Sequence, residues 1–311
     1  MRIVKIGSGR YADCFRVSNG RATVIVKLGF YRENTLKDFA KYLSAGQMDE
    51  ARRVKNNDAI QIANGFGILS NKLVQQHISP HFVFVYANID GKNMADKFAS
   101  LIPERMRSSS PIQLKYNNLS FLEPFDMDLT QWLRKARNVN DATVRGAIFG
   151  VLYTLAALQS TYPQFRHNDL STNNVLVKKC KSPTTYNYRA GPMRFSVTTP
   201  ILVGLSDYDF VHIPRILQNE RVESGKYRVT SRKNNSYDPH FFLKTVGRVT
   251  NGKNLPETDA FLKSLPFAKE DRVDAREIVG MDPLSLLQHP YFASVRRTRL
   301  PKSNAVVYGF S

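Results

Sequence analysis

Two short segments near the start of the chain carry residues that could bind a chain of phosphates. Gly7, Ser8 and Gly9 form a glycine turn between two short apolar runs, and the missing Cβ atoms let backbone N–H groups approach phosphate oxygens. The apolar run Val24 to Val26 then ends in Lys27, and a lysine that faces inward from a strand needs an anionic partner. Each segment also has a structural explanation, because the turn could simply close a hairpin and Lys27 could face solvent at a sheet edge.

Two later segments concentrate acidic and amide side chains at the ends of secondary-structure patterns. His167 to Val177 lies between a long apolar helix pattern and a strand pattern, and contains Asp169 and Asn174. Asp207 and Asp209 follow a second strand pattern. The structural alternatives are an Asx-rich turn for the first segment and a simple turn for the second. Taken together, the four segments match one chemistry, which depends on the resemblance of the third segment described below.

Strand patterns dominate the start of the chain, and helix patterns follow. Residues 1–30 predict three short antiparallel strands, with a hairpin turn at Ser18-Asn19-Gly20. Residues 36–78 have helical periodicity interrupted by glycines, and the alternation from Phe82 to Tyr86 predicts a further strand. Another strand is predicted over Leu119 to Phe125. The first two candidate segments therefore belong to a sheet.

The clearest helix is predicted over Thr143 to Tyr162. Its apolar residues recur at helical spacing, Asp141 can cap its start and Pro163 stops it, so it should be the central buried helix of the second half. Two strand-like segments follow, at Asn174 to Val177 and Phe195 to Leu205, separated by a polar loop. The remainder is predicted to be helical with long connections.

Composition limits the class of protein. The chain has 311 residues, of which 42% are hydrophobic, so it can bury a sizeable core and is not intrinsically disordered. Its 45 Lys and Arg against 26 Asp and Glu give a formal net charge of +19, which favours nucleic acid or acidic partners without deciding between them. Cys14 and Cys180 are too few for a disulfide framework and favour a reducing compartment.

Membrane insertion and secretion are not expected. The longest apolar stretch, Gly146 to Leu158, is well short of the roughly twenty residues that a spanning helix needs. Met1 leads straight into an apolar alternation, so no signal or transit peptide is predicted. The expected location is the cytoplasm.

The pattern His167-Asn168-Asp169-Leu170 followed by Asn174, between a long helix and a strand, resembles the catalytic loop of the protein kinase superfamily. The resemblance implies that Asp169 accepts the proton of the substrate hydroxyl. It also implies that Asn174 and Asp207 bind Mg²⁺, because Asp207-Tyr208-Asp209 resembles the family's Asp-Phe-Gly. Asp209 remains a possible second ligand.

The resemblance extends over nearly the whole chain. Leu122-Glu123-Pro124-Phe125 is similar to the hinge whose backbone meets adenine, and Asp238 resembles the residue that holds the catalytic loop. Residues 286–292 are similar to the last helix of the large lobe. The combination of His167-Asn168-Asp169, Ser79 to Phe82 and Tyr237 to Leu243 looks most like divergent kinases of large cytoplasmic DNA viruses. The implied ATP contacts, besides the catalytic Lys27, are made by Gly7, Ser8, Gly9, Glu123 and Phe125.

The implied fold is α+β, a single bilobal protein-kinase-like domain over residues 1–311. A β-rich N-lobe would cover about 1–125 and a mainly helical C-lobe about 126–311. The implied activity is that of a serine/threonine protein kinase, which uses ATP and Mg²⁺ to phosphorylate Ser or Thr hydroxyls of protein substrates. If the chain is viral, its location would be the host cytoplasm or the virion.

Several residues depart from the family pattern. Ala12 and Cys14 replace a glycine and the valine above the adenine, which should stiffen the turn. Asn168 replaces the arginine that reads a phosphorylated activation loop, so switching by such phosphorylation is not expected. Ser171 replaces a lysine expected at the transferred phosphate. No Ala-Pro-Glu lies between Asp207 and Asp238.

The acidic helix residue that should face Lys27 is also missing, because the family's Glu would fall near Ser70 or Asn71. We therefore expect residues 47–58 to fold as a helix over the small lobe and to supply Glu50, or else Asp58, to Lys27.

Two other functions remain open. The departures fit a pseudokinase that serves as a basic scaffold, although Lys27, Asp169, Asn174 and Asp207 are all present. The Asp207-Tyr208-Asp209 segment is also similar to small-molecule phosphotransferases of the choline-kinase and aminoglycoside type. The basic segment Arg215 to Lys233 predicts an acidic protein substrate, or a nucleic-acid contact.

Overall fold

The chain is described by a computed structural model, an α+β structure with two antiparallel-rich sheets and a set of helices. The residues that it describes are 1–9, 11–98, 110–137, 139–225, 229, 231–268, 277–301 and 306–311. They form two compact units, which are described separately. Unit 1 comprises Met1–Leu69, Val83–Pro124 and Tyr208–Phe210, and unit 2 comprises Ser70–Phe82, Phe125–Asp207 and Val211–Ser311.

A five-stranded antiparallel sheet forms the centre of unit 1. Its strand order is β1-β2-β3-β5-β4. The strands are β1 (Arg2–Ser8), β2 (Ala12–Ser18), β3 (Thr23–Phe30), β4 (Val85–Lys92) and β5 (Tyr116–Leu122). The helices are α1 (Glu33–Ser44), α2 (Met48–Asn56), α3 (Ala59–Gln75, which continues into unit 2), the short 3-10 helix η1 (Ala95–Phe98) and α5 (Pro111–Lys115). The three N-terminal strands and the hairpin at Asn19-Gly20 are confirmed, with Gly20 at φ 84° and the Asn19 side chain accepting the Ala22 N–H at 2.8 Å.

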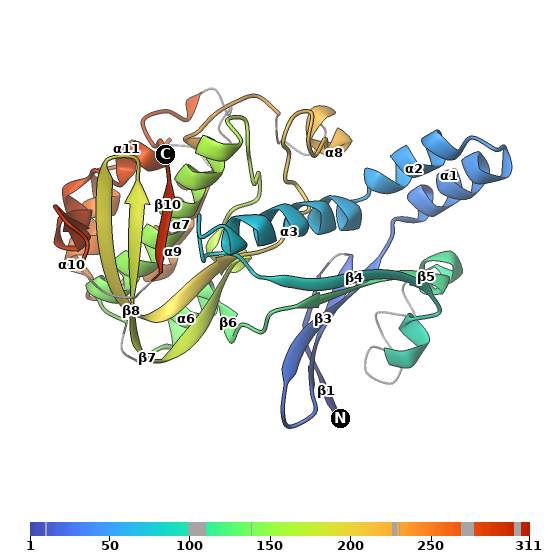
Figure 1. Cartoon of the computed structure of the whole chain (residues 1–311), viewed down its shortest axis with the longest axis horizontal. Coiled ribbons are helices and arrows are strands. Elements are labelled where there is room, and N and C mark those ends of the chain that lie inside the picture. Colours follow the sequence, from blue (N-terminus) through green and yellow to red (C-terminus); the bar gives the residue numbers. More distant parts are fainter. Residues whose placement is uncertain are drawn as a thin grey trace. The chain divides into compact units, whose positions relative to one another are not determined.

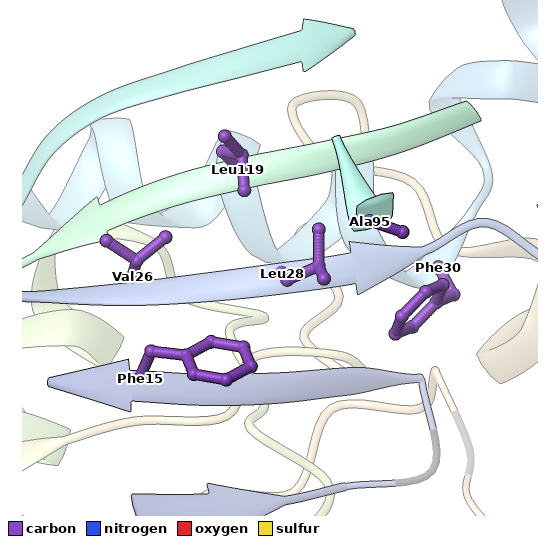
Figure 2. Close-up of a cluster of buried hydrophobic side chains, with 6 residues drawn as sticks. All are labelled: Phe15, Val26, Leu28, Phe30, Ala95 and Leu119. Carbon is purple, nitrogen blue, oxygen red and sulfur yellow. The ribbon is translucent and has the colours of Figure 1, made fainter. Parts of the chain in front are cut away.

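The two faces of this sheet are covered differently. One face carries an apolar cluster drawn in Figure 2, made of Phe15, Val26, Leu28, Phe30, Ala95 and Leu119. Helix α3 packs on the other face, where a Cβ on Gly29 would lie only 3.0 Å from Ile60, and where Ser120 donates to Asn64 at 3.0 Å. Since side chains alternate along a strand, Lys27 lies on the α3 face.

Unit 2 combines a second sheet with most of the remaining helices. Its sheet has the order β10-β7-β8-β9, and β6 pairs with β7. The strands are β6 (Met127–Asp128), β7 (Val175–Ala190), β8 (Met193–Leu205), β9 (Arg296–Arg297) and β10 (Val307–Phe310). The helices are α6 (Leu129–Lys135), α7 (Asp141–Thr161), η2 (Thr172–Asn174), α8 (Glu220–Glu223), α9 (Tyr237–Thr250), α10 (Pro256–Lys263), α11 (Pro283–Leu286) and η4 (Pro290–Val295).

Helix α7 is the buried centre of unit 2, as predicted, and it packs against β8 (Figure 1). Its N-cap is Asn140, whose side chain accepts the Thr143 N–H at 2.9 Å, so the predicted cap at Asp141 is wrong by one residue. The Asp141 carboxylate instead accepts hydrogen bonds from the backbone N–H and the hydroxyl of Thr258 in α10. Helix α7 is long and apolar enough to span a membrane, but 89% of its most apolar window is buried inside the protein, as in a core helix.

The predicted polar loop between two short strands is wrong. Strand β7 continues through this segment to Ala190 and forms a long hairpin with β8, closed at Gly191. The register shifts between Lys179 and Thr184, so the polar residues in between form a bulge. Two short C-terminal strands also replace part of the predicted helix, and β10 pairs parallel to β7.

Candidate active site

The segment around Asp169 is held by a buried carboxylate from α9. Asp238 is 1% exposed, and it accepts the backbone N–H groups of His167 at 2.8 Å and Asn168 at 2.9 Å. Asn168 has a left-handed backbone with φ 65°, which is uncommon for a residue with a Cβ. The two charge-assisted hydrogen bonds fix this strained turn. The geometry agrees with the loop-holding role inferred for Asp238.

Asn174 is joined directly to Asp169. Its side-chain amide donates to the Asp169 carbonyl oxygen at 2.6 Å and to Asp169 Oδ2 at 3.2 Å. Because both bonds use Nδ2, the amide oxygen of Asn174 points elsewhere and can act as an acceptor or a metal ligand. The hydrogen bonds also orient the Asp169 side chain.

Asp207 follows the end of β8, where Ser206 is hydrogen-bonded to the loop that carries Asp169. His167 Nε2 donates to the Ser206 carbonyl oxygen at 3.0 Å, and the Ser206 N–H donates to the Asn174 carbonyl oxygen at 2.9 Å. Asp207 itself has φ 62°, a second left-handed non-glycine residue in this region. Strain of this kind persists only where the surroundings impose it. Asp169, Asn174 and Asp207 are therefore brought together in unit 2.

The charges of this cluster act on one another. Asp169 is exposed, but protein surrounds the inner side of its carboxyl group, and this desolvation raises its pKa. His167 and the hydrogen bond from Asn174 lower the pKa, whereas the neighbouring Asp207 carboxylate raises it. The net direction is upward. A cation beside Asp207 would relieve the repulsion between the two carboxylates.

The donor set fits Mg²⁺ better than a transition metal. Asp207 and the amide oxygen of Asn174 are hard oxygen ligands, and Mg²⁺ is commonly held by one or two such groups together with water and phosphate. In the described part of the chain, His, Cys, Asp and Glu side chains do not gather in any group of three or more that could hold a metal ion.

Arg166 is a functional candidate that the sequence analysis missed. Its side chain is 1% exposed, its guanidinium lies 3.7 Å from the centre of the Tyr237 ring, and it donates to the Arg232 carbonyl oxygen at 2.9 Å. Desolvation lowers the pKa of Arg166 and the Asp238 carboxylate raises it. Arg166 thus connects Arg232, in the segment after Asp207, to the loop that carries Asp169. Basic residues are usually exposed, so only its position next to His167 could have drawn attention to it.

The glycine turn in unit 1 is closed by a carboxylate that was also missed. The Gly9 N–H donates to the Ala12 carbonyl oxygen at 2.7 Å. Ser8 Oγ donates to Asp13 Oδ1 at 2.5 Å, and Lys5 Nζ lies 3.1 Å from the same oxygen. Asp13 is fully buried, on the face that carries the apolar cluster. The hydroxyl of Ser8 is therefore drawn away from the face of Lys27.

Lys27 does not lie at a sheet edge, because β3 runs between β2 and β5. Its Cα is in register with Cys14 on one side and Ser120 on the other, and its side chain is half-buried. The proposed solvent-edge position is thus wrong. Tyr208, the residue after Asp207, packs edge-to-face on Phe66 of α3, with ring centres 4.5 Å apart.

The expected pairing of Glu50 or Asp58 with Lys27 is wrong. Residues Met48–Asn56 do form a helix, but Glu50 is exposed and pairs with Arg53 of the same helix at 2.9 Å. Asp58 is buried and accepts hydrogen bonds from Arg32 at 3.1 Å and from Thr35 at 2.8 Å. Asp58 links the start of α1 to the start of α3, whereas Glu50 makes a surface pair within α2, and the family pattern could not reveal either local role.

The predicted hinge residues fall in different units, Glu123 in unit 1 and Phe125 in unit 2. In unit 1 the Glu123 N–H donates to the Phe84 carbonyl oxygen at 2.8 Å, which aligns the chain after β5. In unit 2 the ring of Phe125 lies so close to Gly204 that a Cβ there would be 2.6 Å from it. Glycine at 204 therefore lets Phe125 pack beside the strand that leads to Asp207.

Comparisons with known proteins agree with the resemblance seen in the sequence. Residues 148–266 match the family model described as poxvirus serine/threonine protein kinase, and this region contains Asp169, Asn174, Asp207 and Asp238. The chain is 33% identical over 131 residues to a protein of Acanthamoeba polyphaga mimivirus named as a serine/threonine-protein kinase, covering 38% of this chain and 28% of the relative.

A second relative is serine/threonine-protein kinase 2 of fowlpox virus (strain NVSL), 32% identical over 85 residues, which is 27% of this chain and 18% of the relative. The matches thus span less than a third of either relative. They confirm the expected similarity to divergent viral kinases.

Proposed function

We propose that the chain transfers the γ-phosphoryl group of ATP to Ser or Thr hydroxyls of protein substrates. The observation that carries the proposal is the arrangement of Asp169, Asn174 and Asp207 around a loop held by Asp238. Phosphoryl transfer needs mainly positioning and charge neutralisation, and this cluster offers both. The names of the viral relatives support the same reaction class.

Asp169 is the group that would orient the acceptor hydroxyl. The hydrogen bond from Asn174 Nδ2 directs one carboxylate oxygen and leaves the other to accept a hydrogen bond from Ser or Thr. Its carboxylate form is the one that can accept the proton. The raised pKa brings Asp169 closer to the pKa of a useful general base.

Asn174 and Asp207 would hold Mg²⁺ through the amide oxygen and the carboxylate. When bound, the ion supplies positive charge that neutralises the phosphate oxygens. In unit 1, the backbone of Gly7, Ser8 and Gly9 would cover the phosphates, and Lys27 would contact the α- and β-phosphates. The backbone of Glu123 and Phe125 would meet the adenine. In this proposal units 1 and 2 correspond to the two lobes of a kinase domain over residues 1–311.

A nucleotide-binding scaffold without activity is the second candidate. It is favoured by Ser171, which stands where the resemblance implies a lysine at the transferred phosphate. Retention of Asp169, Asn174 and Asp207 in one cluster opposes it. The viral relatives also support a viral origin, for which the host cytoplasm or the virion is the proposed location.

Radiolabelled ATP tests the proposal directly. The purified chain is incubated with Mg²⁺ and a mixture of acidic and basic proteins, beside Asp169→Asn and a matched surface control, Asp49→Asn, whose carboxylate is almost fully exposed in α2. We expect label on Ser or Thr with the chain and the control, and loss of about two to four orders of magnitude with Asp169→Asn. Equal labelling by the Asp169 variant would contradict the assigned role, and nucleotide binding without labelling would favour the scaffold. Label on a metabolite such as choline, but not on protein, would identify a small-molecule phosphotransferase.

A further inference from the structure

Three arginines stand in one row across the hairpin sheet of unit 2. Arg189 of β7 is in direct register with Arg194 of β8, and Arg194 is in direct register with Arg297 of β9. Directly opposed residues of antiparallel strands project from the same face of a sheet. Arg189 and Arg297 are exposed and Arg194 is half-buried. The row lies beside the turn at Gly191 and Pro192 that closes the hairpin.

The row occupies the face of the sheet that is turned away from α7. Val197 and Thr199 of β8 lie against Gly146 of α7, within 3.5 Å of the position of an added Cβ. Side chains alternate along β8, so Arg194 projects from the opposite face. Thr198 shares the face of Arg194, where its hydroxyl meets that of Thr185 at 2.8 Å.

The three positive charges have no carboxylate partner within the described residues. Arg194 Nη1 donates to the Pro192 carbonyl oxygen at 3.0 Å, and Arg297 Nη1 donates to the carbonyl oxygens of Ser294 and Arg296 at 2.8 Å each. These neutral acceptors orient the guanidinium groups but do not balance their charge. Each guanidinium has five N–H donors, so most donors of the row stay available. Like charges placed directly opposite on a sheet are unfavourable, and a bound anion would remove that cost.

We infer that the Arg189–Arg194–Arg297 row binds an acidic segment of a partner protein. Neighbouring strands are about 4.8 Å apart, so the row extends over about 10 Å, the reach of a few carboxylates on a short peptide. Each guanidinium can bind one carboxylate through two parallel hydrogen bonds. The site does not depend on phosphoryl transfer, since the row contains none of the residues assigned to that reaction.

Nucleic acid fits this face less well. Proteins that bind single strands stack bases on aromatic side chains. The described neighbours of the row on this face include no aromatic residue: they are Thr185, Asn187, Ser196 and Thr198 of the hairpin and Val307 and Gly309 of β10. Duplex binding generally engages more phosphates than three arginines can contact. The acidic peptide is therefore the occupant that the residues favour.

Fluorescence anisotropy tests the inference with the full chain and no nucleotide. The probe is a labelled polyglutamate peptide, and single-stranded and duplex DNA are measured beside it. Arg189→Gln, Arg194→Gln and Arg297→Gln are combined in one variant. The matched control combines Arg2→Gln, Arg21→Gln and Arg52→Gln, three exposed arginines of unit 1 that remove the same charge.

We expect the row variant to bind the peptide about tenfold more weakly than the chain, and the control about twofold or less. Adding Asp169→Asn to the chain should leave peptide binding unchanged, which separates this site from the proposed reaction. Equal losses in the row and control variants would overturn the inference, because only total charge would then matter. DNA binding that depends on the row, with no binding of the peptide, would overturn it in favour of nucleic acid.

Discussion

The Asp238 carboxylate accepts the backbone N–H of His167 at 2.8 Å through Oδ2, and its other oxygen accepts the next N–H along the chain. A single buried side chain of α9 thereby fixes the conformation of the loop that carries Asp169. It also gives the buried Arg166 guanidinium a negative neighbour. Loop geometry and charge balance at this point depend on one residue.

Asp238→Ala should therefore destabilise the fold and abolish transfer. It leaves two buried N–H groups without acceptors and a buried arginine without its counter-charge, which together cost about 3 kcal/mol or more. The free energy of unfolding, measured by denaturant titration, and the transfer rate check this. Asp282→Ala is the control, because Asp282 also accepts two backbone N–H groups, but at a half-buried helix start where its other oxygen accepts the Asn235 amide, so the loss is about 1 kcal/mol. Similar losses for both variants would contradict the role of Asp238.

On acidification, phosphoryl transfer should be lost at a higher pH than it would be if Asp169 had the pKa of an ordinary aspartate. Desolvation, the largest cause, raises the pKa of Asp169 and persists when Mg²⁺ at Asp207 removes the smaller charge repulsion, and only the carboxylate form accepts the substrate proton. Activity is therefore present above the raised pKa and is lost as the pH falls through it. Single-turnover rates across the acid range, at saturating ATP and Mg²⁺, give this pKa. An acid limb at or below the ordinary aspartate range would show that Asp169 is not the titrating group.

Cys14 provides a test of the nucleotide site that does not need activity. Its Cα is in register with Lys27 on the α3 face, and a nucleotide bound there should cover its thiol. In a Cys180→Ser background, maleimide labelling of Cys14 should slow about tenfold when MgATP is present at about ten times its Kd. Cys180 lies in the bulge of β7 and serves as the control in a Cys14→Ser background, where ATP should have no effect. Equal labelling of Cys14 with and without ATP would contradict nucleotide binding at this face.

The Ser8–Asp13 hydrogen bond should affect nucleotide affinity rather than the chemical step. Ser8→Ala releases the glycine turn from Asp13 and Lys5, so we expect the KM for ATP to rise by up to about tenfold with little change in kcat. Ser18→Ala, at the other end of β2, is the matched control. An unchanged KM together with a lower free energy of unfolding would show that the pair serves stability alone.

The candidate site was largely predictable because its signals are local. Asp169 and Asn174 lie five residues apart in one loop, and their contact follows from that spacing. Asp13 and Arg166 were missed for a physical reason, since both are charged side chains whose burial depends on partners that the sequence does not reveal. The sequence did not reveal the contact of Glu50 either. Glu50 pairs with Arg53 of its own helix and not with Lys27, the partner that the family resemblance implied.

The same distinction applies to the fold. The α7 helix and the N-terminal hairpins have strong periodicity and were predicted. Strand β7 was predicted to end near Val177, because the lysines, threonines and proline that follow do not alternate with apolar residues. Its extension is stabilised by pairing with β8 and β10, which are distant in the sequence. Tertiary pairing of this kind overrides local propensity.

The last prediction concerns His81, which is buried in unit 2. His81 Nδ1 donates to the Val203 carbonyl oxygen at 2.9 Å, so Nε2 accepts the hydrogen bond from the Tyr188 hydroxyl at 2.9 Å. The neutral ring satisfies both partners, whereas a protonated ring would present a second donor to Tyr188. Desolvation by burial accordingly lowers the pKa of His81 to about 4.

Between about pH 6.5 and pH 4, His81 is therefore protonated in the unfolded chain but neutral in the folded protein. The stability that neutral His81 contributes is fully present above pH 6.5, and it is lost as the pH falls toward 4, up to about 3 kcal/mol in all. His81→Gln should reduce the slope of unfolding free energy against pH by nearly one proton in this window, measured by denaturant titration at a series of pH values. Burial and Lys244 also lower the pKa of His240 to about 4, so part of the slope should remain. An unaltered slope in the His81 variant would mean that its ring is already protonated in the folded protein.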